Sequence, residues 1–231
     1  MGRTRYSSRR GLMTDLKNPL STRFTNALAF AAGVHRRQAR KGTQVPYMAH
    51  ILGVASIALE HGANEDEAIA AVLHDSVEDA PKRLGATGVR GAIGERFGPS
   101  VLKIVEGCTD SDVQPKAPWR SRKEQYVSRI PHEGASTLLV SASDKLYNVR
   151  AILEDFRAEG IGVFGRFNKE AGVDGTIGYY RGLVIAFRAR SRQLKDRRVK
   201  RLLDELDRTV SALEQEVGVT GRWPLVRSSS T

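Results

Sequence analysis

The sequence predicts an all-α fold built as one helical domain. Apolar residues recur at the three- and four-residue spacing of amphipathic helices along most of the chain, and no stretch shows the sustained period-two alternation of half-buried strands. The 231 residues are 40% hydrophobic and 27% charged, as is usual for a globular chain that buries a core. No window approaches 18 uninterrupted apolar residues, so we expect no transmembrane helix.

Five helices are expected in the first half of the chain. Ser21 or Thr22 can cap the first, and a loop containing Gly42 and Pro46 separates it from the second. Asn64 is a suitable N-cap for the third, because three acidic residues then occupy the first turn, where the helix dipole favours negative charge. The expected helical ranges are about 21–37, 47–60, 64–75, 89–96 and 99–107.

The second half predicts two more helices, near 121–130 and 135–158, and then a change of character. Residues 160–178 hold six glycines in 19 positions, which favours a mobile loop. One long helix over 179–217 is expected to close the fold. Residues 1–20 and 218–231 are expected to be flexible tails, which leaves 21–217 as the folded domain.

The formal charge of +11 is concentrated at the two ends of the chain. Residues 24–180 hold 19 basic and 19 acidic side chains, so the excess lies in 1–23 and 181–231. It fits either a solvated tail and helix face or attraction to a polyanion such as RNA. The single cysteine, Cys108, cannot form an internal disulfide, and the basic N-terminus lacks the apolar region of a secretory signal. The cytoplasm is therefore the expected compartment.

The run from His74 to Asp79 is the first candidate for chemistry. His74 and Asp75 are adjacent near the expected end of a helix, where both side chains can turn onto one ion. Glu78 and Asp79 each follow one of them by four residues, one turn further along if the helix continues. Three carboxylates at a helix C-terminus require a compensating cation. An imidazole–carboxylate set suits Mn²⁺, Fe²⁺ or Zn²⁺, although a capping or salt-bridged pair is the simpler alternative.

A second candidate follows the apolar run over 138–140. Asp144 and Asn148 are four residues apart and share one helix face. A carboxylate beside an apolar run is costly unless it is paired or bound to a metal. Arg40 and Lys41, in the loop before Pro46, supply positive charge that can clamp phosphates.

Together these residues resemble the HD-superfamily hydrolase region of the Rel/Spo enzymes, and most of all the small alarmone hydrolases. The resemblance covers residues 22–155 in order, and its RKG-to-PYxxH stretch is more specific than the His-Asp pair. It implies an all-helical HD-domain bundle. The matching blocks are FAAGVHRRQARKGTQVPYMAH (30–50), AAVLHDSVEDA (70–80), FGPSVLKIVEGCTD (97–110) and SDKLYNVRAI (143–152).

The resemblance also implies roles for particular residues. It implies one divalent metal ion, usually Mn²⁺, and a water positioned or deprotonated by the adjacent acid pair. His35 matches a position that is not a ligand and is expected to be structural. The implied metal ligands are His50, His74, Asp75 and Asp144; the catalytic acids are Glu78 and Asp79; the substrate-binding residues are Arg40, Lys41, Tyr47, Lys145 and Asn148.

The activity that the resemblance implies is hydrolysis of the 3′-pyrophosphate of ppGpp or pppGpp. Two departures lie near the expected metal site, Ile51 where the family often has proline and Ser143 before Asp144, and the region after Arg150 differs more. Because the region after Arg150 differs, the sequence does not decide which purine base the substrate carries. We expect no synthetase domain in this chain, and a nucleotide rather than a membrane or nucleic acid as partner.

Three alternatives remain open at this point. The first is an HD phosphohydrolase of another nucleotide, such as (p)ppApp or NADPH. The second is an inactive regulator that binds RNA or protein through the basic ends. The third is a hydrolase that neutralises a toxic alarmone synthetase. The oligomeric state is not predicted.

Overall fold

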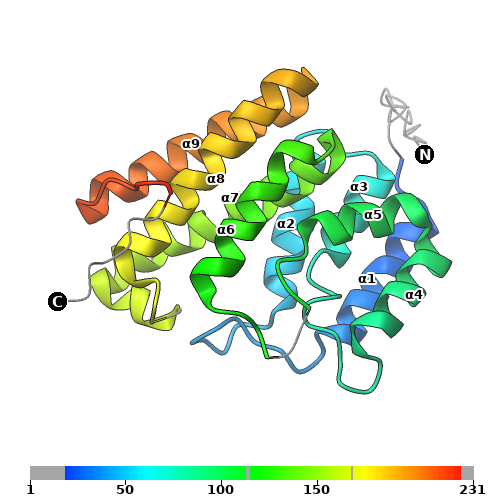
Figure 1. Cartoon of the computed structure of the whole chain (residues 1–231). Helices are drawn as coiled ribbons and strands as arrows, with labels where there is room; N and C mark the ends of the chain where they lie inside the picture. The colour runs from blue at the N-terminus through cyan, green and yellow to red at the C-terminus, as the bar shows by residue number, and fades with distance from the viewer. Residues whose placement is uncertain (1–18, 113–114, 168, 225–231) are drawn as a thin grey trace, which may run out of the picture.

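Helix α7 (Ala135–Glu159) runs through the middle of the molecule and contacts α2, α3, α5, α8 and α9 (Figure 1). The computed structural model describes residues 19–112, 115–167 and 169–224. Over these ranges it contains helices and two 3-10 segments, without a β-strand. The other helices are α1 (Thr22–Val34), α2 (Met48–Glu60), α3 (Glu65–Leu73), α4 (Gly85–Phe97), α5 (Pro99–Cys108), α6 (Trp119–Arg129), α8 (Gly172–Leu194) and α9 (Arg197–Val217), with 3-10 segments η1 (Ile130–His132) and η2 (Gly160–Arg166). The predicted all-α class is confirmed.

Helix starts follow the expected capping chemistry. The Ser21 side chain accepts a hydrogen bond from the backbone N–H of Arg23 at the start of α1. At the start of α3, Asn64 and Glu67 form a reciprocal capping box, which satisfies two backbone donors that a helix start leaves open. These caps fix where α1 and α3 begin.

The expected single helix over 179–217 is wrong in one respect: it is two helices. Helix α8 ends at Leu194, Lys195 adopts a left-handed conformation with φ of 54°, and Asp196 caps α9 by accepting from the N–H groups of Arg198 and Val199. The break lets α9 fold back against α8 and α7 (Figure 1). Its apolar face is then buried through Val199, Leu202, Leu203, Leu206, Val210 and Leu213.

The mobile loop expected over 160–178 is also wrong. Segment η2 buries Val163 and Phe164, and α8 already starts at Gly172. Gly160 and Gly172, the first residues of η2 and α8, adopt positive φ of 69° and 54°. A fixed backbone conformation, rather than chain mobility, explains the glycines at these two positions.

The chain continues in contact with the fold beyond α9. The predicted flexible segment 1–20 lies almost entirely outside the described residues, as does 225–231. Beyond α9, Gly221 donates a hydrogen bond to Glu214, and Val219 and Trp223 pack on the core. The domain boundaries at 21 and 217 stay a prediction.

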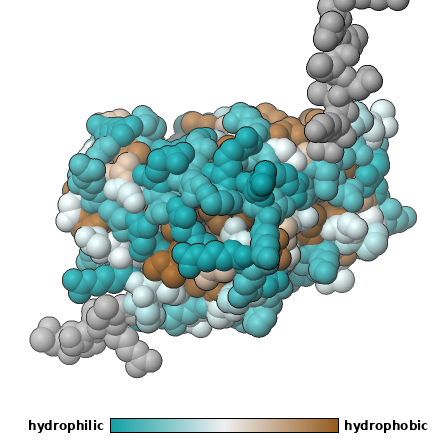
Figure 2. All heavy atoms as spheres, turned by 90° about the horizontal axis from the view of Figure 1, so that it is seen from above, coloured by the Kyte–Doolittle hydropathy of each residue, from teal (hydrophilic) through white to brown (hydrophobic). Residues whose placement is uncertain are grey.

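Among the described residues, no helix combines the length and apolar character needed to cross a bilayer. Hydrophilic side chains dominate the face seen from above in Figure 2, where apolar patches are small and scattered. Isolated apolar patches of this kind are normal on globular proteins.

Candidate metal centre and active site

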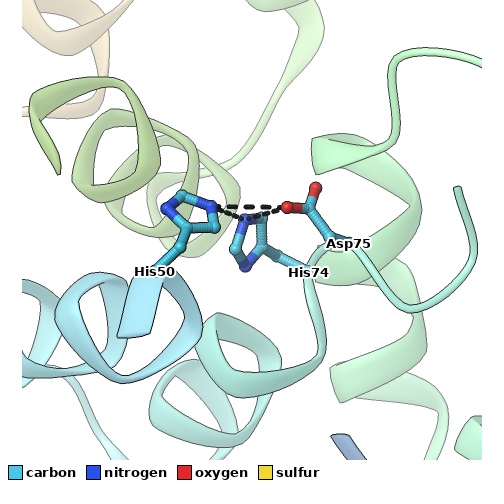
Figure 3. Close-up of side chains that lie close together, drawn as sticks. All are labelled: His50, His74 and Asp75. Atoms are coloured by element: carbon cyan, nitrogen blue, oxygen red, sulfur yellow. Dashed lines mark hydrogen bonds and ion pairs between the residues drawn. The ribbon is translucent and has the colours of Figure 1, made fainter. Parts of the chain in front are cut away.

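Three separate segments bring together the four residues expected to bind metal. His50 lies in the first turn of α2, His74 and Asp75 follow the end of α3, and Asp144 lies in α7. Both imidazoles are buried, at 1% and 2% exposed, and Asp144 is 6% exposed. Figure 3 shows the two rings and the Asp75 carboxylate pointing toward one point. Such buried polar groups require partners.

The distances within this cluster are short. The two Nε2 atoms of His50 and His74 lie 3.2 Å apart. The Asp75 Oδ2 lies 3.3 Å from the His50 Nε2 and 3.0 Å from the His74 Nε2. The Asp144 Oδ1 lies 3.4 and 3.8 Å from the same two nitrogens. Since facing imidazole nitrogens repel when both present lone pairs, this arrangement requires a proton or a cation between them.

Neighbouring groups orient the donors. The His74 Nδ1 lies 2.9 Å from the Ala71 carbonyl oxygen, to which it donates, so in the neutral imidazole the Nε2 faces the cluster with a lone pair. The His50 ring is held by packing instead, with its centroid 5.3 Å from that of Tyr47 and 4.9 Å from that of Tyr147. His50, His74 and Asp75 thus form a candidate divalent-metal site, with Asp144 beside it, and the nitrogen and oxygen donors fit such an ion.

Electrostatics in the cluster favour bound positive charge. Burial lowers the pKa of His50. Burial acts in the same direction on His74, but the carboxylates of Asp75 and Asp144 outweigh it and raise the pKa of His74 to about 9. Burial would raise the pKa of Asp75, yet the His74 imidazole holds it well below its usual range. Two ionised carboxylates against two imidazoles therefore attract a cation.

The acid pair Glu78 and Asp79 lies beside the cluster. Helix α3 ends at Leu73, so it does not continue through the acid pair, which was the condition for placing each acid one helical turn after His74 or Asp75. Residues 74–79 form turns in which the Asp79 N–H still donates to the Asp75 carbonyl at 2.9 Å. Burial, followed by the charge of Asp75, raises the pKa of both acids. A raised carboxyl pKa is typical of general bases.

The predicted substrate-binding residues divide into two groups. Four of them contact one another or the metal cluster: the Tyr47 hydroxyl donates to Asp75 at 2.5 Å, Lys145 and Asn148 each donate to Asp144 at 2.5 Å, and Arg40 donates to Asn148 at 2.9 Å. Lys41 is exposed, and no other described side chain pairs with its ammonium. The structure therefore groups Arg40, Tyr47, Lys145 and Asn148 and leaves Lys41 at the rim of the loop.

Three residues of the site were not anticipated. Lys116 pairs with Glu78 at 2.6 Å, and the Gln38 amide donates to Asp79 at 2.8 Å. The Tyr147 ring lies under the Arg40 guanidinium, 5.6 Å from its centre. His35, expected to be structural, hydrogen-bonds Gln38 through its Nδ1 at 2.7 Å and so helps to position it. Tyr147 and Gln38 lie within the matching blocks 143–152 and 30–50, whereas Lys116 lies outside every block and carried no sequence signal.

A family model for the HD domain matches residues 27–173, well over half of the chain. The chain belongs to the HD-domain family. The match includes every residue of the metal cluster and the acid pair.

Among HD-domain relatives, the guanosine-3′,5′-bis(diphosphate) 3′-pyrophosphohydrolase MESH1 of Mus musculus is 40% identical over 128 residues, which cover 54% of this chain and 66% of the relative. MESH1 of Homo sapiens is 39% identical with the same coverage. The chain thus spans slightly less than two thirds of these relatives. The guanosine-3′,5′-bis(diphosphate) 3′-pyrophosphohydrolase of Aquifex aeolicus is 34% identical over 129 residues, 54% of this chain and 17% of that protein.

A solved HD-domain structure supports the same relationship. It belongs to a metazoan orthologue of SpoT described as hydrolysing ppGpp, with a TM-score of 0.62, 25% identity, and coverage of 83% of this chain and 97% of the other. The structural alignment covers more of this chain than the family model does, so part of the fold outside residues 27–173 is also shared with the metazoan protein.

Proposed function

We propose that this chain is a metal-dependent 3′-pyrophosphohydrolase that converts ppGpp and pppGpp to GDP and GTP with release of pyrophosphate. The observation that carries the proposal is the convergence of His50, His74, Asp75 and Asp144 from three segments, with an acid pair beside them. The names and titles of the HD-domain relatives support the reaction and the substrate. A buried free thiol at Cys108 agrees with a reducing, cytoplasmic location.

The four converging side chains would hold one divalent ion, for which Mn²⁺ is our proposal because the resemblance to the Rel/Spo hydrolase region implies it and the mixed imidazole and carboxylate donors suit it. When bound, such an ion lowers the pKa of water towards about 7 and offsets charge on a phosphoryl oxygen. Tyr47 and Lys145 support the cluster by donating to the Asp75 and Asp144 carboxylates. These bonds leave fewer orientations open to the ligands and so preorganise the site.

Glu78 and Asp79 act on the attacking water. An ionised carboxylate accepts or orients its proton while the water oxygen bonds to the phosphorus next to the 3′-oxygen. The bond from that phosphorus to the 3′-oxygen breaks, and the 3′-oxygen takes up a proton as pyrophosphate leaves. Lys116 and Gln38 hold the two carboxylates in place.

The substrate would lie against the group formed by Arg40 and Asn148. The Arg40 guanidinium lies 5.9 Å from the centre of the Tyr47 ring and 5.6 Å from that of Tyr147, and so packs against two aromatic rings. Its planar fork suits phosphate oxygens. Lys41, exposed at the rim, would add attraction to the diphosphate groups.

The proposal is tested with purified protein and Mn²⁺ on ppGpp, pppGpp, ppApp and NADPH, with the products identified by ion-exchange chromatography. We expect pyrophosphate and GDP or GTP from the first two substrates. Turnover of ppApp or NADPH alone would overturn the guanine assignment. An absence of turnover on all four would overturn the hydrolase assignment.

Two variants separate metal binding from proton transfer. Asp75→Ala removes a carboxylate that contacts both imidazoles, so we expect it to lose metal and turnover together. Glu78→Ala is expected to retain metal while kcat falls by about 10²–10⁴. Metal content measured by atomic absorption distinguishes them. An Asp75→Ala protein without metal but with full activity would refute the site assignment.

A further inference from the structure

A second concave site lies where α8 ends and α9 begins. The cavity has a volume of about 260 Å³ and draws its walls from both helices. Figure 1 shows this junction at the upper end of the antiparallel α8–α9 pair. Its charged lining residues are Arg188, Arg192, Lys195, Asp196, Arg197 and Lys200.

The cavity has more positive charge than its neighbours neutralise. Asp196, its one acidic lining residue, is occupied by Arg198 and by capping α9. Asp204 pairs with both Arg188 and Lys200, at 3.1 and 3.0 Å. No described residue forms an ion pair or hydrogen bond with the side chains of the remaining cations, which are Arg192, Lys195 and Arg197. Three uncompensated cations around one concavity attract an anion.

The backbone of Lys195 is unusual at this cavity. Lys195 is the one described non-glycine residue with positive φ, at 54°. Left-handed backbone disfavours a residue with a Cβ, and glycine usually takes the position after a helix. A charged side chain is therefore kept at a position where glycine would be less strained.

The cavity is separate from the metal centre. Arg198, next to the lining residue Arg197, binds the Gly62 carbonyl and the Glu67 carboxylate at the N-terminal end of α3. His74 follows the opposite end of that helix. Roughly 10 Å of helix separates Glu67 from His74 at 1.5 Å per residue.

We propose that this cavity binds the diphosphate or triphosphate group of a small molecule, either as inorganic pyrophosphate or as the phosphate chain of a nucleotide. Adjacent phosphates place several negative charges within the reach of cations from two helices, and arginine forks bind them in pairs. A concave site of about 260 Å³ suits a compact anion, whereas nucleic acid is recognised by an extended basic stripe. This proposal does not depend on the proposed catalytic activity.

The test is isothermal titration calorimetry of the full chain with inorganic pyrophosphate and, separately, with GTP, in buffer without added divalent metal. The cavity variant is Arg192→Glu/Arg197→Glu. Because both side chains are exposed, we expect this variant to fold like the wild type. The matched control is Arg83→Glu/Lys103→Glu. It reverses the charge of two exposed cations that lie outside the cavity and pair with no described residue. Circular dichroism establishes that each variant is folded.

We expect the cavity variant to bind at least one of the two compounds at least about tenfold more weakly than the wild type, whereas the control variant does not differ. Equal effects on pyrophosphate and GTP would assign recognition to the phosphates, and an effect on GTP alone would add the nucleoside. Any binding at the catalytic site is common to all three proteins, so only the difference between them counts.

Identical isotherms for the wild type and the cavity variant with both compounds would overturn the proposal. So would salt-dependent binding of a single-stranded RNA oligonucleotide that the cavity variant loses, if neither phosphate compound shows a difference. Lys195→Gly adds an independent readout, because it removes a cation while relieving backbone strain. We expect weaker binding together with an unchanged or higher melting temperature, a combination that a purely structural lysine would not give.

Discussion

Glu78 shows how a neighbouring charge can set the working range of a single side chain. Burial and the Asp75 carboxylate raise its pKa, whereas the ammonium of Lys116, 2.6 Å away, lowers it. The side chain must be ionised to accept a proton, so activity should be lost as the pH falls through this pKa. Lys116 therefore extends activity towards lower pH.

Replacing Lys116 by methionine removes the charge and keeps much of the side-chain volume. The pKa of Glu78 should then rise further, and the acid limb of the kcat/KM profile should move to higher pH. The measurement is a pH profile of ppGpp hydrolysis for wild type and Lys116→Met, with Lys82→Met as control because Lys82 is exposed and pairs with no described residue. Coincident acid limbs would show that Glu78 is not the group that titrates.

The site was predictable from sequence only as far as its motifs extend. His74 with Asp75, and Asp144 with Asn148, are close in sequence, and the family resemblance added His50. The contacts of Gln38 with Asp79 and of Lys116 with Glu78 span 41 and 38 residues and depend on how two loops fold back. No local spacing encodes such contacts. The roles assigned to the individual residues stay predictions until variants are measured.

At the scale of elements, α2 and α7 pack closely together at the site. A Cβ added to Gly53 would overlap the Tyr147 ring, and that ring packs against His50 and under Arg40. Gly53 thus lets two helices that supply metal ligands approach each other closely. A glycine in a helix interior costs stability, and this contact is the reason for its presence.

Gly53→Ala should displace Tyr147 and with it His50. Overpacking of this kind costs about 1–3 kcal/mol of unfolding free energy. Displacing a ligand by an ångström should lower kcat by about 10²-fold. Urea unfolding and steady-state kinetics measure the two effects. Gly91→Ala in α4 is the control, since a Cβ there meets nothing within 4 Å and should leave kcat unaltered. Equal behaviour of the two alanine variants would contradict this account.

The two elements that the sequence mispredicted have different causes. Gly160 and Gly172 take positive φ where η2 and α8 start. A count of glycines cannot distinguish such fixed conformations from a flexible loop. The break at Lys195 was hidden because the residues on both sides keep helical spacing and neither glycine nor proline marks it. The capping ability of Asp196 was the one available signal.

At the scale of the whole molecule, the metal centre joins α2, the end of α3 and α7. An ion that binds only the folded chain stabilises it by mass action, by about 2.7 kcal/mol at a hundredfold excess over Kd. Added Mn²⁺ should therefore raise the Tm of the wild type and leave Asp75→Ala unaltered. Thermal unfolding monitored by circular dichroism provides the measurement. An equal rise in both proteins would place the bound ion elsewhere.

The distribution of charge has a related consequence for the whole molecule. Residues 24–180 contain equal numbers of acidic and basic side chains, so the basic excess near α8 and α9 is not cancelled by a neighbouring acidic domain. Many of these arginines nevertheless form ion pairs, as Arg181 does with Asp207. Arg192, Lys195 and Arg197, whose side chains pair with no described residue, lie together at the α8–α9 junction and are available to another molecule.

Both tryptophans of the chain, Trp119 and Trp223, lie against Tyr179, with ring centroids 6.1 and 6.4 Å from it. Tyr179 in turn lies 4.9 Å from the ammonium of Lys123, on the side of the core that faces α6. Intrinsic fluorescence therefore reports on one small region where the start of α6, the middle of α8 and the segment after α9 meet. If the segment after α9 detached, the emission of Trp223 would change while Trp119 stayed in place. Tryptophan fluorescence would therefore detect such a detachment without an added label.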